Sequence, residues 1–114
     1  MTDVTGLAGL PDDPEAIFHL TTPDEWAVAQ DTGSVVPAGF ATEGFVHCST
    51  AAQLAGTIER HFAGQDALVL LRLRPGEVEA DLRWEESRPG EHYPHVYRPL
   101  RLTDVAEVFS WRRA

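Results

Sequence analysis

The spacing of apolar and polar residues divides this chain into short elements, most of which have the pattern of β-strands. Residues 16–21 form a short apolar run, and residues 67–74 form a nearly continuous one that ends in alternation, so both predict strands of a buried core. Residues 104–111 alternate between apolar and polar side chains and predict a final strand. Residues 78–84 alternate in the same way. After the turn at 75–76 we expect them to return as an antiparallel strand.

Two helices are predicted, both in the N-terminal half of the chain. The segment 22–25 combines an N-cap threonine, a proline at the first helical position and the acidic residue of a capping box, so a helix begins there and fades near residue 33. Thr50 and Gln53 form a second capping box. The helix that follows carries apolar residues at steps of four, namely Leu54, Ile58 and Phe62.

The order of these elements predicts the α+β class. A strand–helix–strand–helix half is followed by strands alone, which indicates two helices packed over a curled, mainly antiparallel sheet. Residues 1–15 are rich in Gly, Pro and Asp and are expected to form a loose arm, so the single domain spans 16–114. The polar segment 85–94 predicts a loop. The segment 92–100, rich in proline and aromatic residues, predicts an ordered loop or a short edge strand.

Composition and charge remove several classes of function. All nine basic residues among the 114 are arginines, so chemistry that needs a lysine, such as Schiff-base formation or a phosphate-loop lysine, is excluded. The formal net charge of −9 argues against a large nucleic-acid surface. No apolar run approaches the roughly 20 residues of a membrane span, and the acidic start lacks the pattern of a signal peptide. We therefore expect a cytoplasmic protein without a membrane partner, and no protein partner is evident.

Histidines next to small hydroxyl residues are the main chemical signal in the sequence. His19 lies within the first predicted core strand, with Thr21 two residues later, and His47 ends a short strand that leads into Ser49 and Thr50. A single buried histidine is most often a core residue bonded to a backbone carbonyl. Because two strands carry the same arrangement, a cleft lined by histidines and hydroxyls is the better interpretation.

Further candidates follow later in the chain. His95, with Tyr97 beside it, offers stacking faces and hydrogen-bond donors, although a rigid loop packed on the sheet explains it equally well. Glu85 is a candidate general base or partner of a ribose hydroxyl, with a solvated acidic edge as the alternative. Cys48 and His47 are adjacent, and adjacent strand residues point to opposite faces, so we expect Cys48 to be buried and inert.

Metal binding is the rival use of the same histidines. His47, His92 and His95 with one open position would make the zinc site of a metal-dependent hydrolase. Their spacing matches no compact ligand motif such as His-Glu-x-x-His, so no metal is expected. A third alternative is a module that binds a ligand in the cleft without turning it over.

Several segments together carry a family pattern, and the Gly-Phe-Val-His-Cys-Ser-Thr motif is its most specific part. The segments are 17–21, 43–50, 67–74, 82–85 and 93–100. They resemble a small uncharacterised bacterial family, catalogued as domain of unknown function 952, over nearly the whole chain after residue 15. Membership in this family implies no established activity.

That family in turn is similar to the ADP-ribosyltransferase fold, including its RNA 2′-phosphotransferase branch. In this fold a first-strand histidine followed closely by a hydroxyl residue contacts the nicotinamide-side ribose of NAD, and His19 with Thr21 matches that pattern. A second histidine or tyrosine comes from a following strand, where His47 matches. The third position is often a glutamate; here His95 is preferred and Glu85 is the alternative. Without a clear catalytic glutamate, transfer to a protein side chain is less well supported.

The resemblance therefore implies a small transferase-like enzyme that takes NAD as a substrate, or a related phosphorylated nucleotide. The phosphotransferase branch surrounds a phosphate with arginines and histidines, a role for which Arg98 is the candidate. The residues expected to be catalytic are His19, His47, His95 and Glu85. Those expected to contact the nucleotide are Thr21, Ser49, Thr50, Tyr97 and Arg98.

Overall fold

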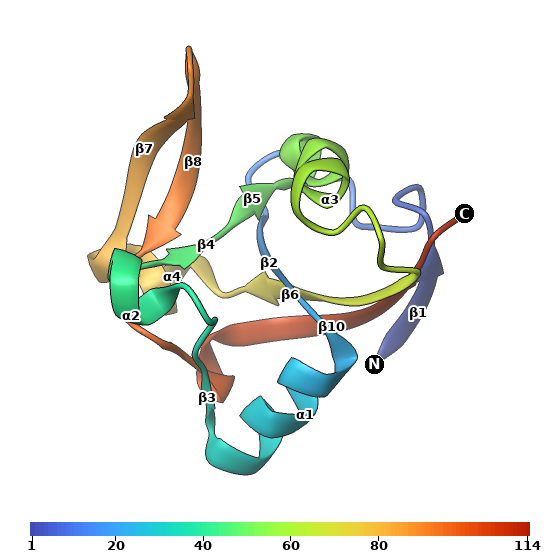
Figure 1. The fold of residues 1–114 in the computed structure, drawn as a ribbon, viewed down its shortest axis with the longest axis horizontal. Helices are drawn as coiled ribbons and strands as arrows, with labels where there is room; N and C mark the ends of the chain where they lie inside the picture. Colours follow the sequence, from blue (N-terminus) through green and yellow to red (C-terminus); the bar gives the residue numbers. More distant parts are fainter.

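A five-stranded sheet forms the centre of the computed structural model, which describes residues 1–114 (Figure 1). The strand order is β1-β10-β6-β2-β5. All neighbours in this sheet are antiparallel except β1 and β10, which run parallel. Its strands are β1 (Thr2–Thr5), β2 (Ile17–Thr21), β5 (Ser49–Thr50), β6 (Ala67–Leu73) and β10 (Val105–Arg112).

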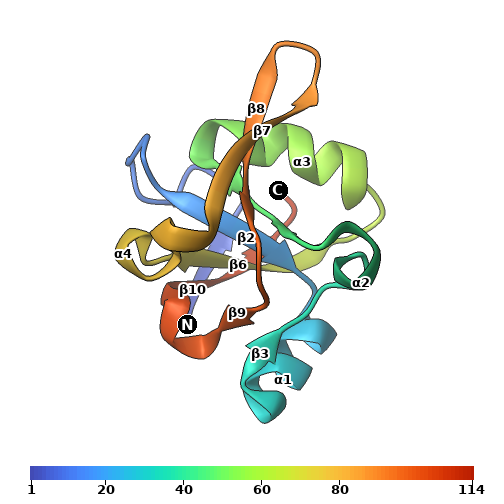
Figure 2. The same cartoon turned by 90° about the vertical axis from the view of Figure 1, so that its left-hand side faces the viewer.

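Two smaller sheets complete the fold. One has the order β4-β8-β7 and consists of β4 (Val46–His47), β7 (Leu82–Arg88) and β8 (Glu91–Val96). The other pairs β3 (Ser34–Val35) with β9 (Leu100–Arg101). The β7–β8 hairpin rises away from the five-stranded sheet, as both ribbon views show (Figures 1 and 2). Only Cys48 separates β4 from β5, so one bent segment crosses from the small sheet to the large one.

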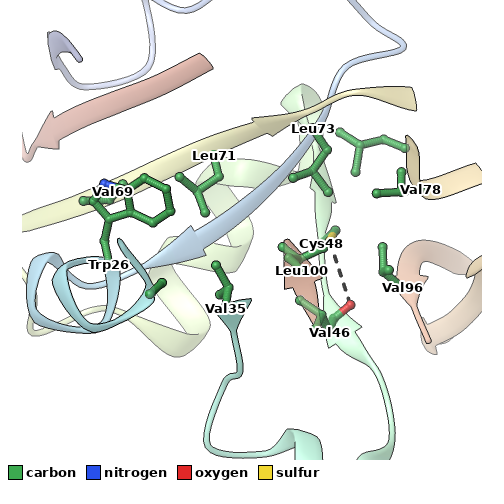
Figure 3. Packing of buried hydrophobic residues seen from close by; sticks show 12 residues of the cluster. Trp26, Val35, Val46, Cys48, Val69, Leu71, Leu73, Val78, Val96 and Leu100 are labelled. Carbon is green, nitrogen blue, oxygen red and sulfur yellow. Dashed lines mark hydrogen bonds between the residues drawn. The ribbon is translucent and has the colours of Figure 1, made fainter. Parts of the chain in front are cut away.

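Both faces of β6 are covered, which explains its nearly continuous apolar sequence. Leu68 and Leu70 pack against Leu54 and Ile58 of α3 (Leu54–His61). Val69 and its neighbours on the opposite face pack against α1 (Pro23–Thr32) and the small sheets, as Figure 3 shows. Two one-turn helices, α2 (Phe40–Glu43) and α4 (Pro75–Val78), connect the strands. None of the helices has the length and apolar character that a membrane crossing requires.

The sequence-based prediction of the α+β class is confirmed, as are the strands at 17–21, 67–73 and 105–112. The helix starts are confirmed as well. The Thr22 hydroxyl accepts the Glu25 backbone N–H at 3.1 Å, and Gly33 ends α1 with a φ of 90°. At the second start, the side chain of Gln53 accepts the Thr50 backbone N–H at 3.0 Å.

Several local predictions were wrong. Residues 2–5 do not belong to a loose arm; they pair with β10, and Val4 is buried. Residues 78–81, predicted as the start of a strand, instead end α4 and form a 3-10 turn, because Pro75 opens a helical turn and so short a stretch cannot separate the helical period from the strand period. Residues 82–88 then pair with β8, not with β6.

The segment 85–94 is a hairpin rather than a loop. Its charged residues lower its hydropathy, but they extend into the cleft and solvent while the backbone remains paired. Gly90, with a φ of 76°, makes the turn between the two strands. β8 is the central strand of its sheet, not an edge, although it contains Pro94. The proline carbonyl still accepts the Cys48 N–H at 3.0 Å, so the bend of the chain from β4 into β5 uses this position.

Candidate functional site

A cleft of about 910 Å³ opens where the five-stranded and three-stranded sheets separate. This volume is within the range of small-molecule sites in proteins. β5 pairs with β2 only at Ile17 and Phe18. On the other side of the bend at Cys48, the preceding strand β4 pairs with β8 instead. The remaining part of β2, residues 19–21, therefore has no strand on this side and lines the cleft.

His19 is fixed at the point where the sheets separate. Its Nδ1 lies 2.7 Å from the carbonyl oxygen of His47. Because a carbonyl only accepts, the Nδ1–H donates and Nε2 carries the lone pair. Nε2 makes no hydrogen bond within the protein, although the residue is only 5% exposed. Burial lowers the pKa of His19 despite the backbone hydrogen bond, so the ring is a neutral acceptor that faces the cleft.

Thr21 lies on the same face of β2 as His19, because side chains two residues apart in a strand share a face. It is 3% exposed, lines the cleft and makes no side-chain hydrogen bond within the protein. The hydroxyl of Thr21 and Nε2 of His19 are therefore two polar groups on one face of β2 that line the cleft and have no hydrogen-bond partner within the protein.

Glu85 is held from the opposite wall. Its Oε1 accepts from the Tyr97 hydroxyl at 2.5 Å and from Nδ1 of His95 at 2.8 Å. The hydrogen bond from Tyr97, followed by that from His95, lowers the pKa of the carboxyl. Oε2 has no partner, and the side chain is 38% exposed. The result is an oriented carboxylate that stays ionised and offers one free oxygen to the cleft.

His95 supports this carboxylate from a buried position. Its Nε2 lies 3.3 Å from the hydroxyl of Ser87, so both ring nitrogens have protein partners. Its ring stacks on Phe45, with centroids 4.1 Å apart and an interplanar angle of 13°. His47 meets the same phenyl ring edge-on at 4.8 Å. Tyr97 packs on it at 5.2 Å, so the wall of the cleft between Glu85 and His47 is aromatic.

The α3 side of the cleft carries positive charge. Arg60 donates to the Tyr93 hydroxyl at 2.6 Å, and Tyr93 donates to Glu91 at 2.7 Å. This chain of hydrogen bonds joins α3 to the β7–β8 hairpin. Arg88, near the tip of the hairpin, also lines the cleft and makes no hydrogen bond or ion pair.

Seven of the nine predicted site residues line this cleft, namely His19, Thr21, His47, Ser49, Glu85, His95 and Tyr97. Ser49 is less free than predicted. Thr57 donates its hydroxyl proton to the Gln53 carbonyl at 3.0 Å, so the 2.9 Å contact between Ser49 and Thr57 uses the Ser49 proton. Phe45, Glu43 and Arg60 also line the cleft but were not predicted from the sequence. Phe45 lies within the family motif and Glu43 directly precedes it, so their position beside His47 could have indicated them.

Thr50 and Arg98 do not line the cleft, contrary to the prediction. Thr50 takes part in the capping box of the helical segment that follows. Arg98 binds the fully buried carboxylate of Asp104 through both terminal nitrogens, at 2.7 and 3.2 Å, and Asp81 through Nε at 2.9 Å. Since all of its guanidinium nitrogens have partners, Arg98 stabilises the loops around β9 and has no free group for a phosphate.

The three-histidine metal site is not formed. Alternation along β8 places His92 on the opposite face from His95, and His92 does not line the cleft. No group of three or more His, Cys, Asp or Glu side chains has an arrangement that would hold a metal ion. Cys48 is buried as predicted, and burial raises the pKa of its thiol, so it remains protonated.

The fold and site define a small α+β protein with a polar and aromatic cleft between two separated sheets. The chain belongs to the DUF952 family, described as "Protein of unknown function", whose model matches residues 20–108. The crystal structure of protein CC0527 from Caulobacter crescentus is similar, with 34% identity, a TM-score of 0.77 and coverage of 83% of this chain and 84% of that one. Its solution NMR structure has 35% identity, a TM-score of 0.71 and coverage of 82% and 81%. No curated protein matches the sequence.

Proposed function

We propose that the cleft binds NAD or a closely related dinucleotide and that the protein cleaves the bond between nicotinamide and ribose, transferring the ADP-ribose part. The observation that carries this proposal is the pair formed by His19 and Thr21. Both side chains are more than nine-tenths buried, and each directs an unpartnered polar group into the cleft. An acceptor nitrogen next to a hydroxyl complements a ribose diol, which donates and accepts hydrogen bonds. The resemblance to ADP-ribosyltransferases noted above implies the same ligand.

Glu85 supports the reaction proposed for this ligand. Cleavage of a nicotinamide–ribose bond develops positive charge on the ribose, which a fixed carboxylate across the cleft would stabilise. Tyr97 and His95 hold Oε1 of Glu85 and leave Oε2 free. The two nitrogens of His95 are already used, so the geometry favours Glu85 over His95 as the third reactive position. His95 is then a positioning residue for the carboxylate.

The remaining walls suit the other parts of a dinucleotide. Phe45, His47 and Tyr97 form an aromatic wall against which a nicotinamide ring can pack. Arg60 of α3 and Arg88 of β7 supply positive charge to the cleft, where a diphosphate would be neutralised in an otherwise acidic protein. The cleft thus offers a hydroxyl-binding edge, an aromatic wall, a carboxylate and a cationic end to one ligand.

Calorimetric titration with NAD and with ADP-ribose tests the binding, and chromatography of released nicotinamide tests the reaction. We expect Thr21→Val, which removes only the hydroxyl, and His19→Ala each to weaken binding about tenfold, roughly one lost hydrogen bond to a buried group. His92→Ala, on the opposite face of β8, is the matched control and should bind like the wild type. Failure of the wild-type protein to bind either ligand at millimolar concentration contradicts the proposal. Binding without nicotinamide release would instead assign a non-catalytic ligand-binding module.

A further inference from the structure

A second carboxylate–imidazole pair lies at the rim of the cleft. Oε1 of Glu43, the last residue of α2, lies 2.9 Å from Nε2 of His47. The two side chains are 41% and 56% exposed. A contact this exposed contributes about 0–1 kcal/mol to folding, so little of the protein's stability depends on it. Both residues line the cleft.

The chain makes room for this carboxylate at Gly39. A Cβ at that position would lie 2.7 Å from Oε1 of Glu43. Gly39 has a φ of −78°, a conformation that any residue adopts, so its backbone does not require glycine. Alanine at this position would therefore require the flexible end of the Glu43 side chain to move from its place beside His47.

The pair fixes which nitrogen of His47 carries the proton. A carboxylate accepts, so Nε2–H donates to Glu43 and the lone pair remains on Nδ1. Nδ1 makes no hydrogen bond within the protein. Phe45 contacts the ring edge-on, and the His95 ring lies 5.2 Å away at an interplanar angle of 77°, so the imidazole is held from two sides. An oriented imidazole with one free nitrogen is the arrangement of a general base.

We propose that Glu43 and His47 form a general-base dyad that activates the acceptor, a hydroxyl group or water, in the reaction proposed above. This inference rests on the proposed function. The acceptor oxygen bonds to the ribose carbon as the bond from that carbon to nicotinamide breaks, and the bonding electron pair leaves with neutral nicotinamide. The acceptor proton passes to Nδ1 of His47, and the Glu43 carboxylate stabilises the resulting imidazolium. His47 is the catalytic residue of this step, and Glu43 is a positioning residue.

Nitrogen-15 NMR of the histidine rings tests the dyad without any ligand. At neutral pH we expect the Nε2–H tautomer of His47 to dominate in the wild-type protein. Glu43→Ala should give a mixture of tautomers, and Gly39→Ala should do the same because it displaces the carboxylate while keeping its charge. Glu59→Gln, which removes an exposed carboxylate from the outer side of α3, is the control for net charge and should keep the wild-type signature. An unchanged tautomer in Glu43→Ala overturns the dyad.

Nicotinamide release tests the proton transfer. We expect Glu43→Ala and Gly39→Ala to lower kcat about tenfold to a hundredfold with little change in KM, because the base acts in the transition state rather than in substrate binding. His47→Ala should lower kcat at least as much. Equal kcat values for Glu43→Ala and wild type overturn the inference while the proposed function stands. No nicotinamide release by the wild type overturns both the proposed function and the proton transfer, whereas the tautomer measurement still decides whether the dyad exists.

Discussion

Nδ1 of His19 lies 2.7 Å from the carbonyl oxygen of His47, and this hydrogen bond joins β2 of the large sheet to β4 of the small one. It lies at the place where the two sheets separate, so the same contact closes the base of the cleft and sets the tautomer of His19. The carbonyl of His47 here bonds to a side chain, while the His47 ring extends toward Glu43 at the rim. His47 of the family motif thus contributes its backbone carbonyl to the base of the cleft and its imidazole to the rim.

Replacement of Glu85 by glutamine should lower nicotinamide release about a hundredfold and change NAD affinity by less than about threefold. The reason is that a neutral amide cannot stabilise positive charge that develops only in the transition state. Steady-state kinetics together with calorimetry measure both quantities. Glu107→Gln is the control, because the Glu107 carboxylate is exposed, pairs with Arg72 and does not line the cleft. Equal losses of activity in the two variants would contradict the role of Glu85.

Stability should fall as the pH is lowered from neutrality, partly because of His19. Burial lowers the pKa of this residue below its ordinary value of 6.5 in the folded protein. Between the folded-state pKa and 6.5 the unfolded chain binds the proton more strongly, so acidification through this window favours unfolding. Urea denaturation at about pH 7.5 and about pH 5.5 measures the loss. We expect a smaller loss in His19→Gln than in His61→Gln, which alters an exposed histidine of α3.

Arg98→Ala should destabilise the protein by about 3 kcal/mol, because it leaves the buried carboxylate of Asp104 without its partner. Burial by itself would raise the pKa of Asp104, but the hydrogen bonds from Arg98 and from the Arg101 backbone lower it, so the group stays charged. Arg72→Ala, which removes a more exposed pair with Glu107, should cost less than about 1 kcal/mol. Urea denaturation compares the two variants. Similar losses would show that Arg98 is an ordinary surface residue.

The Cys48 thiol should react with a thiol reagent only when the protein unfolds. Burial raises its pKa and blocks access, while its Sγ contacts the carbonyl oxygen of Val46 at 3.8 Å (Figure 3). We expect labelling in native buffer to be at least about a hundredfold slower than in concentrated urea. Rapid labelling of the native protein would show that β4 and β5 open at this point.

The elements that were predicted correctly are those whose stabilising contacts join residues close together in the sequence. The cap at Thr22 and the stripe of Leu54 and Ile58 depend on residues three or four positions apart, so their pattern is visible in one stretch of chain. The hairpin at residues 82–96 was missed because its strands are stabilised by pairing with each other, and its cleft-facing side chains are charged. The helical turns over residues 75–81 were missed because the alternation from Val78 onward also fits a strand.

The α+β class, the strands at 17–21, 67–73 and 105–112, the helix starts and the histidines beside hydroxyl residues were predictable from the amino-acid sequence, because each depends on composition or short-range spacing. Which polar groups are free to bind a ligand depends on tertiary contacts. Arg98 and Ser49 were both predicted to bind the ligand. In the structure, Arg98 instead forms hydrogen bonds with Asp104, and Ser49 forms one with Thr57. The partners of a polar side chain come from distant segments, so spacing along the chain cannot show whether its hydrogen bonds are already made.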